Sequence, residues 1–301
     1  MKKIIATLLA CSALTAPAFA QDAITEFRIG ILGGETVQDR LTSQECYRAA
    51  IETALGVPVK LFTPADYDGV IQGLLGGSLD MAWLGASAYA KIFLTDPKAV
   101  DLALTKENVD GSTGYYSIGI ARKDSGITSM MDGKGKVFGF AEPNSTSGYL
   151  IPAVEIPLAT GASMEPGDFF ADVKFTGGHE QTIVAVANGD VDAGVTWADG
   201  LGNFEDGYNS GALRRAADAG LVNMNDLVQI WQSGLIPEGP MVVRSALPAD
   251  VKEKVIQLTA DLHETDKVCA YGVAAGEAKD FIPVTQEAYT TIIEARKLQG
   301  N

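Results

Sequence analysis

One short pattern occurs twice in this chain, and this repetition constrains the fold more than any other feature. In the first copy, Tyr67 begins an apolar helical segment and lies 13 residues before Asp80. In the second copy, His179 begins a similar segment and lies 13 residues before Asp192. Each helical segment stops at a glycine, and a Gly-x-apolar-Asp start of a strand follows. The repeat predicts two similar lobes, each of which presents a hydrogen-bonding ring at the start of a helix.

Apolar runs of strand length alternate with segments of helical periodicity through most of the chain. Such alternation is typical of an α/β fold, and we expect each lobe to contain a mainly parallel sheet flanked by helices. The expected strands are 27–31, 57–62, 79–84, 114–121, 137–141, 173–175, 191–195, 227–231 and 241–244. The expected helices are 43–55, 67–75, a segment from 147 onward, 179–187, 249–262 and 286–298. Because ligands bind beyond the carboxyl ends of such strands, we expect a shared cleft between the lobes.

The N-terminus has the features of a secretory signal peptide. Two lysines precede an apolar run, and an Ala-x-Ala sequence at 18–20 predicts cleavage before Gln21. The apolar run is too short to remain as a membrane span. Cys11 follows a sequence that loosely resembles a lipoprotein cleavage site, but Leu9 is unusual there, so we favour secretion over lipid anchoring. Removal of residues 1–20 leaves 281 residues, which is enough for two lobes.

The chain is strongly acidic. Its formal net charge is −15 at pH 7, and loss of the two signal-peptide lysines changes this to −17. A charge of this sign opposes binding to nucleic acid and to anionic membrane surfaces. An anionic ligand would therefore have to be held by directed hydrogen-bond donors, because the field of the whole protein repels it.

Two cysteines remain after processing, Cys46 and Cys269. In an oxidising compartment we expect a disulfide between them, which would join an early helix to the C-terminal part of the chain. Two buried free thiols are the alternative, and the sequence alone leaves both open.

Residues 142–148 read Glu-Pro-Asn-Ser-Thr-Ser-Gly and lie between an expected strand and the next apolar run. A Pro/Asn turn followed by hydroxyl residues is typical of a helix N-terminus, whose first amides lack partners and whose dipole favours an anion. No lysine or arginine lies within 140–150 or 176–183, so the donors would be neutral. We interpret the segment as an oxyanion site. The alternative, that Ser145 or Ser147 only caps the helix, stays open.

Seven segments, in order along the chain, carry a family resemblance: 66–71 (DYDGVI), 80–85 (DMAWLG), 114–117 (GYYS), 142–148 (EPNSTSG), 178–180 (GHE), 185–189 (AVANG) and 235–240 (LIPEGP). In these segments the chain resembles the phosphonate- and phosphite-binding periplasmic components of ABC transporters. The resemblance covers most of the mature chain. It implies a two-lobed type II periplasmic binding protein in which two crossing strands form the hinge. The first lobe would comprise residues 21–119 and 235–301, and the second lobe residues 120–234.

The resemblance also implies a ligand site. The phosphonate oxygens would be held by six donors: Tyr67, Tyr115, Ser145, Thr146, Ser147 and His179. Asp199 matches a position where family members that bind aminoalkylphosphonates have a carboxylate, and Glu238 lies one residue from the position of a second. These acids would pair with a ligand ammonium, which makes 2-aminoethylphosphonate the expected ligand. The alternatives are that Asp199 caps a turn, that Glu238 faces solvent, and that the ligand is methylphosphonate, phosphite or phosphate.

The resemblance implies transport rather than catalysis, so we expect no enzymatic activity and no cofactor. An enzyme on the same fold is the alternative, because Ser145 or Ser147 together with His179 could suggest nucleophilic catalysis. Neither serine lies in a Gly-x-Ser-x-Gly motif, however. His179 and His263 are the only histidines, so no metal site is expected. The expected partners are a small phosphonate and an ABC permease, with the chain acting as a periplasmic monomer. A receptor that presents its ligand to a membrane sensor is a further alternative.

Overall fold

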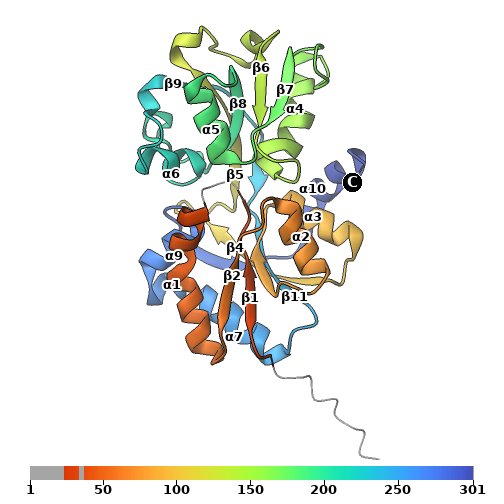
Figure 1. Ribbon diagram of the computed structural model, residues 1–301, viewed down its shortest axis with the longest axis vertical. Coiled ribbons are helices and arrows are strands. Elements are labelled where there is room, and N and C mark those ends of the chain that lie inside the picture. Colours follow the sequence, from red (N-terminus) through yellow and green to blue (C-terminus); the bar gives the residue numbers. More distant parts are fainter. Residues whose placement is uncertain (1–23, 34–36, 301) are drawn as a thin grey trace, which may run out of the picture.

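The computed structural model describes residues 24–33 and 37–300. This part of the chain forms two lobes that follow one another along the long axis of the molecule, each built on a six-stranded sheet (Figure 1). The expected signal peptide, residues 1–20, and Cys11 within it lie outside the described residues. Among the helices that are described, none is long and apolar enough to cross a membrane.

The first sheet has the strand order β12-β4-β11-β3-β1-β2. Its strands are β1 (Phe27–Gly30), β2 (Val59–Phe62), β3 (Met81–Trp83), β4 (Val100–Glu107), β11 (Pro240–Arg244) and β12 (Asp280–Pro283). The helices of this lobe are α1 (Val37–Leu55), α2 (Tyr67–Leu75), α3 (Ala86–Thr95), α7 (Ala249–Ala260), α8 (Leu262–Thr265), α9 (Lys267–Ala274) and α10 (Thr290–Leu298). One apolar cluster lies under α1, α7 and α9 and a second under α2, α3 and α10, so the sheet is covered on both faces.

The second sheet has the order β10-β5-β8-β6-β7, and β9 pairs with β5. Its strands are β5 (Gly114–Arg122), β6 (Val137–Phe140), β7 (Asp172–Phe175), β8 (Ala193–Ala198), β9 (Leu227–Gln232) and β10 (Ile236–Pro237). The helices of this lobe are α4 (Ile151–Thr160), α5 (His179–Asn188) and α6 (Ala212–Asp218). One apolar cluster lies under α5 and α6, and another lies under α4 beside stacked phenylalanines.

Most strands of each sheet run in one direction, as expected, but both sheets also contain strands that run the opposite way. In the first sheet β1 is parallel to β2 and β3, whereas β11 and β12 pair antiparallel with their neighbours. In the second sheet β6 is parallel to β7 and β8, whereas β5 pairs antiparallel with β8, β9 and β10. Parallel neighbours need a crossover connection such as a helix. Strands β5 and β11 instead enter their sheets directly from the other lobe, and each runs antiparallel to its neighbours in the sheet.

Two short segments connect the lobes. Residues 108–113 lead from β4 to β5, and Glu238-Gly239 leads from β10 to β11. We expected the first connection after residue 119, but β5 already begins at Gly114 and pairs only within the second sheet. We therefore propose that the described residues up to 107 and residues 240–300 form the first lobe, and 114–237 the second. A Cβ atom at Gly239 would lie 1.9 Å from the carbonyl oxygen of Leu84, so this connection admits no side chain.

The internal repeat corresponds to equivalent contacts in the two lobes. Asp80 accepts a hydrogen bond from the amide of Arg28 on β1 through Oδ2 at 2.9 Å. Asp192 accepts one from the amide of Val137 on β6 in the same way at 2.8 Å. In each lobe the repeated aspartate thus joins the strand that follows it to a parallel neighbour, β3 to β1 in the first lobe and β8 to β6 in the second. Helices α2 and α5 begin at the two repeated rings, as expected.

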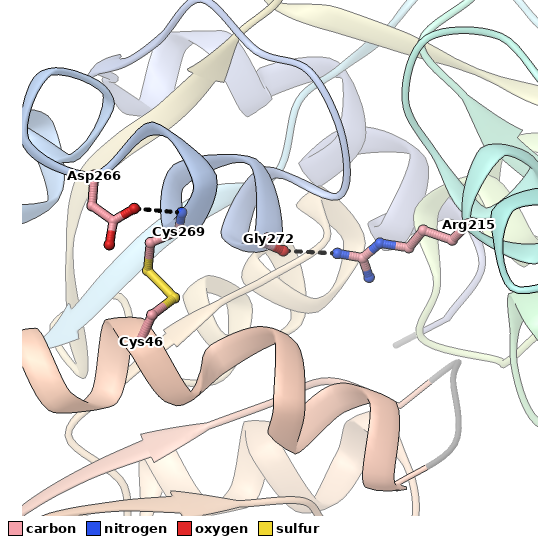
Figure 2. Close-up of a disulfide and its surroundings, with 5 residues drawn as sticks. All are labelled: Cys46, Arg215, Asp266, Cys269 and Gly272. Atoms are coloured by element: carbon pink, nitrogen blue, oxygen red, sulfur yellow. Dashed lines mark hydrogen bonds between the residues drawn. A yellow bond between two sulfur atoms is a disulfide. The ribbon is translucent and has the colours of Figure 1, made fainter.

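A disulfide joins Cys46 on α1 to Cys269 on α9, with the Cα atoms 5.8 Å apart (Figure 2). The same helix α9 contacts the second lobe, because the Arg215 guanidinium on α6 donates a hydrogen bond to the carbonyl of Gly272 at 2.9 Å (Figure 2). The disulfide therefore anchors a helix that also contacts the opposite lobe.

Candidate functional site

A cavity of about 240 Å³ lies between the lobes, beside the Glu238-Gly239 connection. Seven of the eight expected site residues line it: Tyr67, Tyr115, Ser145, Thr146, Ser147, His179 and Glu238. Asp199 is buried but is not among the residues that line the cavity. The fold therefore gathers side chains from both lobes and from the connection between them. A cavity of this size suits a small ligand.

The centre of the site is the turn that follows β6. Ser145 precedes a single π-helical turn, Thr146–Leu150, and its Oγ accepts a hydrogen bond from the amide of Gly148 at 3.0 Å. Ser145 is thus the cap of this turn and also a residue of the cavity wall. A Cβ atom at Gly148 would lie 2.8 Å from Ser145 Oγ and 3.0 Å from Cε1 of His179. Glycine is needed here because the turn and His179 approach each other so closely. Single π-helical turns frequently occur at functional sites.

His179 is the first residue of α5 and only 6% of its surface is exposed. Its Nε2 atom lies 3.1 Å from Ser145 Oγ. Burial lowers the pKa of His179 to about 3, so the ring is neutral at pH 7. Its Nδ1 atom is buried and has no hydrogen-bond partner among the described residues. A buried ring nitrogen without a partner is costly, and a ligand atom would satisfy it.

The two residues after Ser145 contact different elements. Thr146 Oγ1 accepts a hydrogen bond from the amide of Ser87, in the first turn of α3, at 2.9 Å, and so joins the two lobes. The carbonyl of Ser147 accepts one from Ser117 Oγ on β5 at 2.7 Å. Burial raises the pKa of Tyr115, and hydrogen bonds to Ser147 and Thr146 partly offset this. The Tyr115 hydroxyl therefore lies beside both hydroxyl residues.

Tyr67 approaches the cavity from the first lobe. It is the first residue of α2, a helix capped by Asp66, whose carboxylate accepts a hydrogen bond from the amide of Gly69 at 2.9 Å. Glu142 of the second lobe accepts a hydrogen bond from the backbone of Tyr67 and another from the amide of Asn144 at 2.6 Å. Burial raises the pKa of Glu142. A second-lobe carboxylate thus lies at the positive N-terminal end of α2.

The two expected ammonium-binding acids have partners within the chain. Glu238 Oε1 lies 2.7 Å from Nζ of Lys106. Asp199 accepts hydrogen bonds from Ser210 Oγ at 3.0 Å and from the amide of Leu201 at 3.1 Å. By accepting from the Leu201 amide, Asp199 caps a turn, which is the alternative to ammonium binding that the sequence left open for this residue. Glu238 does not face solvent, because its side chain is only 9% exposed.

The cavity has charged lining residues that the sequence did not indicate. Lys106 on β4 and Arg215 on α6 both line it, although no cation lies near the motif in sequence. Trp197 on β8 also lines it and packs edge-on against Tyr115, with ring centroids 5.5 Å apart. A buried lysine is uncommon, but the sequence did not signal this one, because its burial in β4 follows from the fold. No group of residues able to bind a metal ion occurs within residues 24–33 and 37–300.

Comparisons with known proteins show what the chain is similar to. Residues 36–289 match the family model described as "ABC transporter, phosphonate, periplasmic substrate-binding protein". The chain is 33% identical over 267 residues to the phosphonates-binding periplasmic protein of Escherichia coli K12. The aligned residues cover 84% of this chain and 72% of that protein. It is 27% identical over 289 residues to the phosphate-import protein PhnD of Mycolicibacterium smegmatis, and the aligned residues cover 91% of this chain and 86% of that protein.

Among solved structures, the chain is similar to a binding-protein component of an ABC phosphonate transporter from Pseudomonas aeruginosa. The TM-score is 0.77 at 26% identity, with 91% of this chain and 86% of that chain covered. This similarity confirms the expected two-lobed class of fold.

Proposed function

This chain belongs to the family of periplasmic substrate-binding proteins of phosphonate ABC transporters, and we propose that it captures a small phosphonate between its lobes and delivers it to a membrane permease. The cavity is bordered by both lobes and by the connection between them. A ligand in this position would hold the lobes together, and its release would let them separate.

The observation that carries this proposal is the directed set of donors around Ser145 and His179. The Gly148 amide donates to Ser145 Oγ, and the Ser145 hydroxyl can then donate to Nε2 of His179. In that arrangement Nδ1 of His179 carries the proton, and it has no partner among the described residues. A phosphonate oxygen would accept from Nδ1 and from the hydroxyls of Thr146 and Ser147. Hydrogen bonds to a charged oxygen are the stronger kind.

The same histidine supports binding over catalysis. A general base works best when its pKa lies near the operating pH. Burial lowers the pKa of His179 to about 3, so it would be a weak base for activating Ser145 or Ser147. The relatives described above are a phosphonates-binding periplasmic protein and a phosphate-import protein. We therefore propose a receptor rather than an enzyme, exported to the periplasm by the segment 1–20 and acting as a monomer.

The expected preference for 2-aminoethylphosphonate has less support from this geometry than the phosphonate site itself. It required one or both of the expected acids to be open to a ligand ammonium. Glu238 is paired with Lys106, and Asp199 lies outside the cavity wall. Phosphate is a further candidate, because one relative is a phosphate-import protein.

Calorimetric titration of the mature chain with methylphosphonate, 2-aminoethylphosphonate, phosphite and phosphate tests the proposal. We expect at least one phosphonate to bind more tightly than phosphate, and phosphorus NMR to show the ligand unchanged after long incubation. Ser78→Ala is a matched control for Ser147→Ala, because Ser78 is exposed and outside the cavity wall. Binding that is equally strong in both variants, or absent from the wild type, would refute the site.

A further inference from the structure

Lys106 is buried at the edge of the cavity although its ammonium group carries a full charge. Only 4% of the residue is exposed. Its Nζ atom lies 2.7 Å from Glu238 Oε1 and 5.5 Å from the centre of the Trp197 ring. It also donates a hydrogen bond to Ser210 Oγ at 3.2 Å. Lysine is almost never buried to this extent unless it is paired, so these contacts hold the ammonium in place.

The Lys106 ammonium connects both acids that the sequence assigned to a ligand amine. It neutralises Glu238 directly. It reaches Asp199 through Ser210, whose hydroxyl donates to Asp199 Oδ2 at 3.0 Å. An ammonium group of the chain itself thus lies where the ammonium of an aminoalkylphosphonate was expected.

We propose that Lys106 determines specificity by taking the place of a ligand ammonium, so that the site selects phosphonates whose tail carries no positive charge. This inference rests on the proposed function, since it concerns the tail of the same ligand. It assigns the Glu238 end of the cavity to an uncharged tail such as a methyl or ethyl group.

The charges that line the cavity favour this assignment. Its charged lining residues within the described chain are Lys106, Arg215 and Glu238, and His179 is neutral. The lining therefore carries one net positive charge, which suits an anionic head group and opposes a second cation. An incoming ammonium would either lie beside Lys106 or displace it. The first is repulsive because the Lys106 ammonium is buried, and the second breaks the contacts to Trp197 and Ser210.

Titration calorimetry with a matched pair of ligands tests this proposal. Ethylphosphonate and 2-aminoethylphosphonate have the same carbon chain and differ by the terminal ammonium, and methylphosphonate gives the effect of tail length. For the wild type we expect the alkyl ligands to bind about tenfold or more tightly than the amino ligand, since one charged contact corresponds to roughly that factor. Tighter binding of 2-aminoethylphosphonate by the wild type would overturn the inference without any variant.

Lys106→Met removes the ammonium and keeps the length of the side chain. It leaves Glu238 unpaired, so we expect the affinity ratio to shift by about tenfold or more toward 2-aminoethylphosphonate. The double variant Lys106→Met, Glu238→Gln should lose that shift. Lys279→Met is the matched control, because Lys279 is exposed and pairs with Glu107 at 2.9 Å outside the cavity wall.

The outcomes separate the two proposals. A wild type that binds no phosphonate refutes the proposed function and this inference with it. A wild type that binds phosphonates, with an affinity ratio that Lys106→Met leaves unchanged, refutes only the role of Lys106. Should Lys106→Met fail to fold, the wild-type ratio of ethylphosphonate to 2-aminoethylphosphonate affinity still decides the question.

Discussion

Replacing His179 by glutamine should remove much of the acid sensitivity of folding. In the folded chain burial lowers the pKa of His179 to about 3, against an ordinary value of 6.5. The ring is the first residue of α5, where the helix dipole also disfavours a cation. Between pH 6.5 and pH 3 the unfolded chain therefore binds a proton at this ring that the folded chain does not.

The sign and the size follow from proton linkage. Because the folded pKa is depressed, the contribution to stability is complete above pH 6.5 and is lost as the pH falls toward 3. One bound proton changes the free energy of unfolding by about 1.4 kcal/mol per pH unit. When the pH falls from 8 to 5, only the last 1.5 pH units or so lie below the unfolded pKa of 6.5. Over that interval His179 should account for a loss of about 2 kcal/mol in the free energy of unfolding.

Urea unfolding of the ligand-free protein, followed by circular dichroism from pH 8 to pH 5, measures this loss. His179→Gln should lose about 2 kcal/mol less than the wild type over that range. His263→Gln is the comparison variant, because burial also lowers the pKa of His263, but Asp280 partly offsets this, so its loss should lie between those of the wild type and His179→Gln. If the wild type and His179→Gln lose stability in parallel, His179 is not the buried neutral ring described here.

The remaining predictions concern the hydroxyl donors, the connection between the lobes and the disulfide. Thr146→Ala and Ser147→Ala should each weaken phosphonate binding by about 1–3 kcal/mol, measured by calorimetry. Thermal unfolding should change little in Ser147→Ala, whereas Thr146→Ala should also lower the melting temperature, because the Ser87 amide loses its acceptor; unchanged affinity in both would argue against the site. Gly239→Ala should lower the yield of folded protein or its melting temperature, because the added methyl group meets backbone that cannot yield; a stable, fully active variant would contradict the clash. Replacing Cys46 and Cys269 by serine should lower the free energy of unfolding by about 2–5 kcal/mol in denaturant titrations; no loss would show that the bridge contributes little.

The elements that could be predicted are those whose signals are local. The repeat located the starts of α2 and α5 at Tyr67 and His179, because a ring, an apolar helix and a glycine stop follow one another within a short segment. The hydroxyl motif likewise marked a helix start, expected from residue 147, and a helical turn begins at Thr146 with Ser145 as its cap and α4 following. Its π-helical form was not predicted.

The features that were missed depend on contacts between residues far apart in the sequence. Strand β4 has a lysine and an acid at its end, so its burial was not evident, and Lys106 was overlooked with it. The partner of Lys106 is Glu238, which lies on the second connection between the lobes. A single sequence carries no signal that joins these two positions. The pairing that decides the charge at the ligand tail was therefore visible only in the fold.

A crystal structure of the mature chain with methylphosphonate tests the central claim most directly. We predict that the phosphonate group lies within about 3.2 Å of the hydroxyls of Thr146 and Ser147 and of Nδ1 of His179, which are hydrogen-bond distances. Lys106 should remain on Glu238, with the methyl group toward that end of the cavity. A phosphonate bound outside the turn that follows Ser145, or held there by Lys106 rather than by His179, would contradict the account.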